Sequence, residues 1–317
     1  MKSNIDTAID ENVFCQADYL GIIKVTGDDA QSFLQGQFSN DVALTSESHS
    51  QLNSYNSPKG RLYAIFRLFK STDDYYLLLP KEILEPVIKR LRMFVMRSKV
   101  VLEDLSENWT TIGLSGSLVK SSISHFPGEV NGVIHENELT YIQIPGTEKR
   151  LLIIGPTDEI TKLKSSIEQN FSEVDENFWK RLDIHAGFPS IYSSSQEEFV
   201  AQMVNLQLVD GVSFTKGCYP GQEVVARMHY LGKLKKRMYR VVIEGNSIPA
   251  PAENLYLANN DNTQSIGQIV DAQLNDSGGI DALAVLQTKV IGDESDIRVG
   301  STDGTSIEIA DLPYSFE

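Results

Sequence analysis

The chain has 317 residues, of which 41% are hydrophobic and 22% charged, a composition typical of a folded protein with room for two or three modules. No apolar run approaches the roughly 20 residues that a membrane span needs, and the polar first residues lack the apolar core of a signal peptide, so we expect a cytoplasmic protein without a membrane partner. The formal net charge of −15 argues against bulk affinity for nucleic acid. Two cysteines, Cys15 and Cys218, predict neither a disulfide framework nor a metal cluster.

The first third of the chain predicts strands followed by an amphipathic helix. Asp28 is expected to cap a short helix that runs through Gln35 and stops at a left-handed Gly36. Residues 61–69 and 75–79 are typical of strands. Apolar residues then recur at three- and four-residue spacing over residues 83–95, which predicts a helix with one buried face.

The same succession of strand and helix returns later. Residues 151–154 predict a strand, and the apolar residues of 160–171 predict a helix, so the chain suggests two α+β halves of ferredoxin-like character. Asp175 is expected to cap a further helix that stops at Gly187. After residue 240 the pattern changes to short strands separated by turns, which favours a small β-barrel.

The most unusual stretch is an octet with two glycines around a cysteine. It reads Lys216, Gly217, Cys218, Tyr219, Pro220, Gly221, Gln222 and Glu223. Pro220 and Gly221 fit the two central positions of a type II turn, the second of which needs a positive φ. A thiol on such a turn, near Lys216 and Arg227, is expected to be exposed and reactive. The alternative is a buried Cys218 packed under the turn, because free cysteines are among the most buried residues.

The octet resembles the Lys-Gly-Cys-Tyr-x-Gly-Gln-Glu signature of the YgfZ proteins, which are folate-binding relatives of the glycine-cleavage T-protein. The likeness covers nearly the whole chain through further motifs, at residues 25–28, 33–37, 39–42, 58–61, 187–189, 199–206 and 312–315. Several motifs in the right order make a chance match a poor explanation.

The resemblance implies an α+β fold: a T-protein-like arrangement of ferredoxin-like α+β domains around a central opening, plus a small C-terminal β-barrel. On this plan we place domains at residues 1–105, at 106–237, where the second ends in the octet loop, and at 238–317. The resemblance also implies tetrahydrofolate or a derivative as cofactor. It implies a role in iron–sulfur enzyme assembly or repair and in tRNA modification, with Cys218 as the working thiol.

A pterin ring needs a flat wall and a polar group for its amino-pyrimidine edge, and the resemblance indicates where these lie. Trp179 matches the tryptophan that folate contacts in the family, and stacking there is worth about 1 kcal/mol beyond area burial; the alternative is an ordinary core tryptophan. The family's second aromatic contact falls on Leu20. His185 stands where T-proteins have a glutamate, and an imidazole cannot accept two parallel hydrogen bonds. Asp183 is the candidate substitute; otherwise folate binds more weakly, another ligand binds, or His185 is structural.

One departure from the T-proteins decides between functional hypotheses. T-proteins place a catalytic acidic pair just after a Gly-Gly turn, and the matching residues 59–65 contain no acid. General acid–base work on an amine intermediate therefore has no obvious agent. We expect an accessory protein rather than an enzyme. A tetrahydrofolate-dependent one-carbon transferase of the aminomethyl type is the first alternative, and a non-catalytic scaffold with a vestigial folate pocket is the second.

The octet loop is expected at the mouth of the folate opening. We assign Lys216, Glu223 and Arg227 to the same catalytic site as the Cys218 thiol. Gly217, Tyr219, Gly221 and Gln222 are the motif residues around it. Three stretches, 59–70, 89–99 and 227–240, hold 4, 5 and 6 basic residues and no acid. If they meet, they form a positive face for a polyglutamylated folate or an RNA backbone; otherwise they are three separate solvated surfaces. We expect a monomer that contacts iron–sulfur enzymes or assembly proteins, with indirect or weak contact to tRNA.

Overall fold

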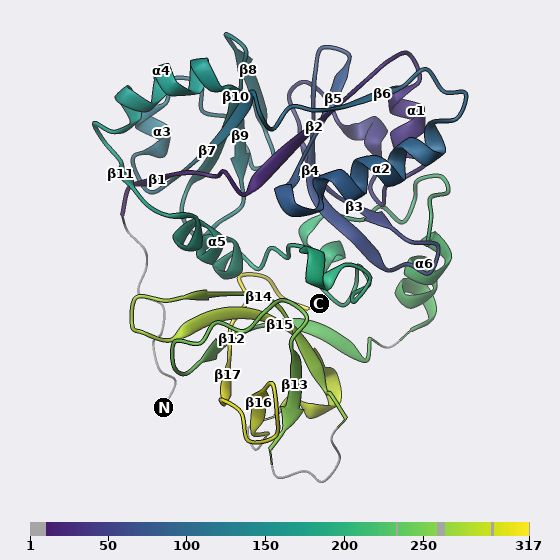
Figure 1. Cartoon of the computed structure of the whole chain (residues 1–317), viewed down its shortest axis with the longest axis vertical. Helices are drawn as coiled ribbons and strands as arrows, with labels where there is room; N and C mark the ends of the chain where they lie inside the picture. Colours follow the sequence, from purple (N-terminus) through teal and green to yellow (C-terminus); the bar gives the residue numbers. More distant parts are fainter. Residues whose placement is uncertain (1–10, 233, 259–263, 293–294, 317) are drawn as a thin grey trace.

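The computed structural model describes residues 11–232, 234–258, 264–292 and 295–316, and three β-sheets organise them. Figure 1 shows two α+β halves side by side, with the third sheet beneath them. The first half contains an antiparallel five-stranded sheet in the order β3-β4-β5-β2-β6. Its strands are β2 (Leu20–Thr26), β3 (Gln51–Asn56), β4 (Leu62–Ser71), β5 (Asp74–Pro80) and β6 (Val101–Asp104). Strands β4 and β5 confirm the two strands predicted from the sequence.

Two helices, α1 (Ala30–Gln35) and α2 (Leu84–Val95), pack on this sheet. Helix α2 confirms the predicted amphipathic helix, since its apolar stripe is buried in the same cluster as the strands. Helix α1 starts one residue later than predicted, because its N-cap is Asp29 and not Asp28. The prediction of a left-handed conformation at Gly36 was wrong. Its φ is −80°, because its N–H still bonds to the Phe33 carbonyl as in a right-handed turn.

The second half contains a six-stranded sheet in the order β11-β1-β7-β10-β9-β8. Its strands are β1 (Val13–Gln16), β7 (Trp109–Ser115), β8 (Val133–Glu136), β9 (Leu139–Ile144), β10 (Arg150–Pro156) and β11 (Ser172–Glu173). Helices α3 (Val119–Ser122) and α4 (Thr157–Ile167) contribute to the core on one face. Strand β1 comes from the start of the chain and pairs with β7 and β11. The second sheet thus takes a strand from the predicted first domain, and the three domain boundaries stay a prediction.

Helix α5 (Glu176–His185) lies between the second half and the C-terminal sheet, as Figure 1 shows. The predicted cap is confirmed, because the Asp175 carboxylate accepts a hydrogen bond from the Phe178 N–H at 2.8 Å. After the helix, Gly187 turns the chain at a φ of +69°. The helix packs against β1 on one side and against β14 and β15 on the other.

The C-terminal sheet has the order β16-β13-β14-β15-β12-β17 and is curled into a half-barrel, which is the form that the predicted small β-barrel takes. Its strands are β12 (Lys236–Ile243), β13 (Asn254–Leu257), β14 (Gly267–Leu274), β15 (Ile280–Gln287), β16 (Ile297–Val299) and β17 (Ile307–Ala310). Helix α6 (Gln222–Leu231) precedes it. Among the described residues, none of the helices has the length and apolar character needed to cross a membrane.

The two halves share one buried cluster, which fixes their relative positions. Side chains of the first sheet meet those of the second sheet and of α5 in this cluster; they include Ile22, Phe69, Ile142, Leu152 and Trp179. A space between two sheets that are otherwise joined by apolar packing is a natural place for a ligand cavity.

Candidate functional site

A cavity of about 100 Å³, the central cavity, lies between the two halves. Strands of both sheets and helix α5 contribute to its wall, which includes Leu20, Leu52, Ile65, Arg67, Leu78, Trp179 and Asp183. A second space of about 300 Å³, the outer cavity, shares Pro145 and Phe188 with it and is also lined by Asn131. The structure therefore brings three of the four predicted folate-contacting residues to one cavity.

Trp179 is covered on most of its surface, with only 1% exposed. The guanidinium of Arg150 lies 4.5 Å from its ring centroid. Strand β7 packs against one face of the indole, because a Cβ on Gly113 would come within 2.4 to 2.6 Å of three consecutive ring atoms. A ligand in the central cavity would meet the part of the indole that these neighbours leave open. A ligand cannot sandwich the ring, because the β7 backbone at Gly113 occupies one of its faces.

Asp183 supplies a carboxylate to the central cavity, and this carboxylate is already paired. Its Oδ1 lies 2.8 Å from Nη2 of Arg150, whose side chain is buried. The pair holds Asp183 in place, and a carboxylate with two oxygens keeps lone pairs free to accept ligand N–H groups. The position favours Asp183 as the substitute for the family glutamate, a role that stays a prediction.

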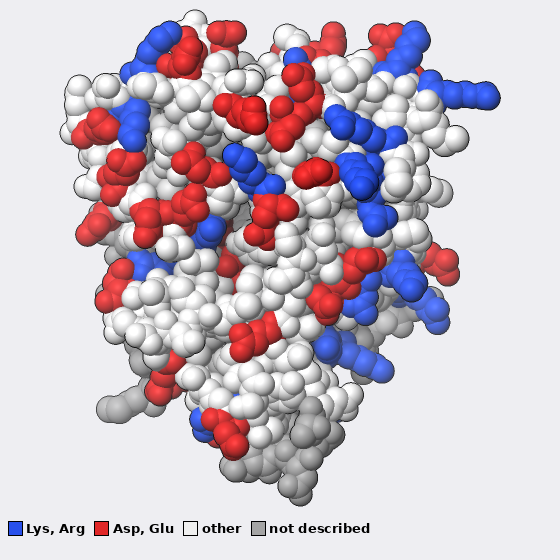
Figure 2. All heavy atoms as spheres, in the orientation of Figure 1, with Lys and Arg blue, Asp and Glu red and all other residues white. Residues whose placement is uncertain are grey.

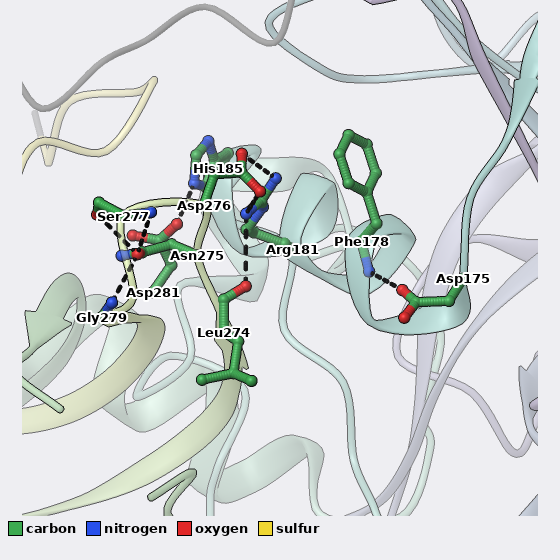
Figure 3. A network of polar contacts seen from close by, with 10 residues as sticks. All are labelled: Asp175, Phe178, Arg181, His185, Leu274, Asn275, Asp276, Ser277, Gly279 and Asp281. Carbon is green, nitrogen blue, oxygen red and sulfur yellow. Dashed lines mark hydrogen bonds and ion pairs between the residues drawn. The ribbon is translucent and has the colours of Figure 1, made fainter. Parts of the chain in front are cut away.

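His185 binds the C-terminal sheet. Figure 3 shows its ring directed at Asp281 on β15, with 2.7 Å between Nε2 and Oδ2. One turn earlier, Arg181 forms two contacts of 2.7 Å with Asp276. Burial alone would raise the pKa of Asp281, but the hydrogen bond and charge of His185, with the charges of Arg240 and Arg181, lower it below its ordinary value. His185 thus fastens α5 to this sheet; it is not among the described residues of the central cavity wall, and its folate contact stays a prediction.

Arg67 is a cavity residue that the sequence analysis missed, because it was counted only within the basic stretch 59–70. It lies in strand β4 and is 7% exposed. A signal was present: a single cation stands between Phe66 and Leu68 in a strand with apolar residues on both faces. Buried cations of this kind are rare without a partner.

The octet loop forms the second candidate site. Cys218 is exposed, whereas Cys15 is buried and burial raises the pKa of its thiol to about 12. Gly221 has a φ of +80°, which confirms the positive φ predicted for the turn. A Cβ on Gly221 would lie 2.5 Å from the Ser57 carbonyl oxygen and 2.6 Å from Cα of Gly60. The loop therefore rests backbone against backbone on the turn that carries the motif at residues 58–61.

Lys216 ties the loop to a third motif region. Its ammonium donates hydrogen bonds to the carbonyl oxygens of Gln35, Phe38 and Asn40 at 2.8, 2.7 and 2.8 Å. Burial lowers the pKa of Lys216 to about 8. The three carbonyls favour the charged form, since only an ammonium offers three N–H donors. Lys216 is therefore a strut that holds the Cys218 loop against the first half.

The remaining loop residues divide into framework and surface. Tyr219 is buried, and its ring centroid lies 5.3 Å from Nζ of Lys216. Gln222 Nε2 lies 3.4 Å from the Lys216 carbonyl oxygen. Gly217, Glu223 and Arg227 are exposed. The Gln202 amide, from the motif at residues 199–206, donates to the Val225 carbonyl of α6 at 2.5 Å. Four separate motifs thus meet around this loop.

The expected position of Cys218 at the mouth of the folate opening stays a prediction. Among the described residues, those that line the central and outer cavities do not include Cys218. His229 stacks on Phe214, with ring centroids 3.7 Å apart. The octet loop rests on the turn between β3 and β4, and both of these strands also supply residues to the wall of the central cavity.

The basic stretches meet only in part. The Arg90 guanidinium lies 3.8 Å from the ring centroid of Tyr63, which joins stretch 89–99 to stretch 59–70. Figure 2 shows Lys and Arg side chains gathered on the side where Figure 1 places α2 and α6, while Asp and Glu dominate the other half of this face. Arg67 and Arg240 are buried and do not contribute to this surface, and Lys233 lies outside the described residues.

The arrangement of sheets defines the class of protein. The chain superposes on the glycine cleavage system aminomethyltransferase T from Bartonella henselae with a TM-score of 0.74, over 96% of this chain and 86% of that chain, at 11% sequence identity. This likeness shows the fold and confirms the predicted T-protein-like α+β architecture.

Sequence comparison then gives the family. The chain is 30% identical over 305 residues to the tRNA-modifying protein YgfZ of Yersinia pestis (strain Pestoides F), covering 94% of this chain and 91% of the relative. The YgfZ proteins of Hamiltonella defensa and Colwellia psychrerythraea are 31% and 28% identical, covering 84% and 96% of this chain and 80% and 94% of the relatives. No family model matches the chain. The chain belongs to the YgfZ family of tRNA-modifying proteins, as the motifs predicted.

Proposed function

We propose that this protein binds tetrahydrofolate or a derivative and acts as an accessory protein that supports iron–sulfur enzyme assembly or repair in tRNA modification. The observation that carries the proposal is the exposed Cys218 thiol on a loop that four motifs of the family hold in place. A thiolate is the reactive and metal-binding form of cysteine. A single exposed cysteine cannot enclose a metal, which takes about four ligands in a structural site, so Cys218 would act by redox chemistry, transient cluster contact or partner contact.

The central cavity fits a folate in its chemistry. The Asp183 carboxylate accepts hydrogen bonds of the kind a pterin edge donates, and apolar side chains with Trp179 provide walls. Ligand pockets for drug-sized molecules measure roughly 300–1,000 Å³, so a central cavity of about 100 Å³ holds only part of the ligand. The remainder would occupy the adjoining outer cavity of about 300 Å³.

We further propose that the protein acts in the cytoplasm, because its two free cysteines suit a reducing compartment. We also propose that it acts as a monomer. With a net charge of −15, any contact with tRNA would be indirect or weak.

One observation favours a second candidate function, a one-carbon transferase. Asp183 is a carboxylate in the described wall of the central cavity, and catalysis needs such a group. Its Oδ1 is already paired with Arg150, however, so only the lone pairs that this ion pair leaves free could take part in proton transfer.

Fluorescence titration with tetrahydrofolate tests the folate site. The chain has two tryptophans, so the signal of Trp179 is isolated in Trp109→Phe, and Trp179→Phe is the matched control. We expect saturable quenching that Trp179→Phe removes. A folded protein that shows no quenching and no calorimetric heat at millimolar tetrahydrofolate would refute folate binding.

The role of Cys218 is tested separately. Cys218→Ser should leave tetrahydrofolate affinity unchanged and abolish the ability of the protein to restore an iron–sulfur-dependent tRNA modification in cells that lack it, with Cys15→Ser as control. Turnover of methylene-tetrahydrofolate that Cys218→Ser leaves intact would favour the transferase instead.

A further inference from the structure

Arg67 occupies the middle of an apolar wall. In the antiparallel register of the first sheet it lies between Leu52 on β3 and Leu78 on β5. These two neighbours and Ile65, two residues earlier on the same strand and face, also line the central cavity. A guanidinium therefore stands in a row of aliphatic side chains that all face the same space.

Arg67 makes no ion pair with a carboxylate in the part of the chain that the structure describes, although the charge of Asp183 acts on it and partly offsets the effect of burial on its pKa. Its hydrogen bonds both come from Nη1 and go to neutral acceptors, Ser50 Oγ at 3.1 Å and Asn131 Oδ1 at 2.7 Å. This leaves Nε and Nη2 available to a ligand. Burial lowers the pKa of Arg67 to about 10, which expresses the cost of a charge held out of water. Proteins pair such charges, because an isolated buried ion is strongly unfavourable.

The nearby carboxylate is shared between two guanidinium groups, those of Arg67 and Arg150. Asp183 shares the central cavity wall with Arg67, but its Oδ1 is paired with Arg150 at 2.8 Å. Two guanidiniums and one carboxylate leave this region with one positive charge in excess. A ligand that brings one negative charge would complete the balance.

The position of Asn131 locates this charge along the cavities. Arg67 belongs to the wall of the central cavity and donates to Asn131, which belongs to the wall of the outer cavity. The guanidinium therefore lies at the passage between the two spaces. A ligand that contacts both residues must offer N–H donors to the Asp183 carboxylate and an acceptor group to the Arg67 guanidinium.

We propose that Arg67 forms a carboxylate subsite, in which Nε and Nη2 bind a ligand carboxylate at the passage between the central and outer cavities. The planar guanidinium fork matches a carboxylate in a bidentate pair. The inference deepens the proposed function and rests on the same cavity being the ligand site: the carboxylate belongs to the glutamate tail of a folate or to another small organic acid, and the two sources can be separated.

Calorimetric titration with three probes tests the subsite: tetrahydrofolate, p-aminobenzoylglutamate, which has the carboxylates without the pterin, and tetrahydrobiopterin, which has the ring without a carboxylate. The variants are Arg67→Met and Arg67→Lys, with Lys70→Met as a matched loss of charge on the same strand. We expect Arg67→Met to weaken both carboxylate probes by about 10- to 100-fold and to leave tetrahydrobiopterin unchanged. Arg67→Lys, which keeps the charge and loses the fork, should be intermediate and serves if Arg67→Met does not fold.

The outcomes separate this inference from the proposed function. Binding of p-aminobenzoylglutamate that Arg67→Met removes, without any binding of tetrahydrofolate, would support the subsite and refute the folate proposal. Equal losses for all three probes, no loss, or the same loss in Lys70→Met would overturn the subsite. It would also be overturned if the wild-type protein bound neither carboxylate probe.

Discussion

Gly221 is where the fold of the octet loop is most sensitive to a single methyl group. In Gly221→Ala the new Cβ would lie 2.5 Å from the Ser57 carbonyl oxygen and 2.6 Å from Cα of Gly60, and both of these atoms belong to backbone that cannot rotate away. The φ of +80° adds the strain of a left-handed alanine, about 1–2 kcal/mol. Overpacking costs about 1–3 kcal/mol more. We therefore expect Gly221→Ala to lower the free energy of unfolding by about 2–5 kcal/mol.

Gly217 in the same loop is the matched control. A Cβ there would meet nothing within 4 Å, and its φ is not in the left-handed region, so Gly217→Ala should change stability by less than about 0.5 kcal/mol. Urea unfolding followed by circular dichroism measures both variants, and the rate of Cys218 modification by an aromatic disulfide reagent reports the loop itself. If the two alanine variants were equally stable and equally reactive, the loop would not rest on the turn at residues 57–60.

Three further predictions concern the groups that hold the sites. Burial lowers the pKa of Lys216 from 10.5 to about 8, so between these pH values the folded protein binds fewer protons than the unfolded chain. The stability of the wild type should therefore rise with pH across this window, and that of Lys216→Met should not. Midpoints of urea unfolding at several pH values measure the difference. The pKa of Asp281 is lowered in the fold, so its contribution is present above the ordinary carboxyl pKa and lost as pH falls through the lowered one. Asp281→Asn should flatten this acid limb in thermal melts, His185→Ala should do the same, and additive effects of the two would contradict their pairing. Gly113→Ala would place a Cβ 2.4 Å from the Trp179 ring and should cost about 1–3 kcal/mol with a changed indole emission spectrum; an unaltered spectrum would show that the ring has room to move.

Local patterns were sufficient where one element decides its own structure. The stripe of apolar residues predicted α2, and Asp175 predicted the start of α5, because both signals act within a few residues. The prediction for Gly36 also used a local signal and was wrong, because glycine permits a left-handed conformation but does not require it. The family motifs predicted the architecture and the loop, which their convergence around Lys216 now explains.

Partners far apart in the sequence could not be predicted from the chain. His185 meets Asp281, which is 96 residues away, and nothing in the local sequence of either residue indicates the other. Arg67 looked like one of several surface cations until the second sheet was placed opposite it. Strand β1 has only four residues, and its period-two pattern specifies which face is buried but not which strand lies beside it.

The position of β1 also governs how the molecule can be assembled. Its neighbours, β7 and β11, lie at residues 109–115 and 172–173 of 317. During synthesis the first strand therefore has its first partner only after more than a third of the polypeptide has been made, and its second only after more than half. If the chain were cut after residue 105, β1 would remain on the first fragment. The sheet of the second fragment would then have a gap between β11 and β7. Because strand β1 belongs to the sheet of the second half, the first residues of the chain join the two halves into one cooperative unit.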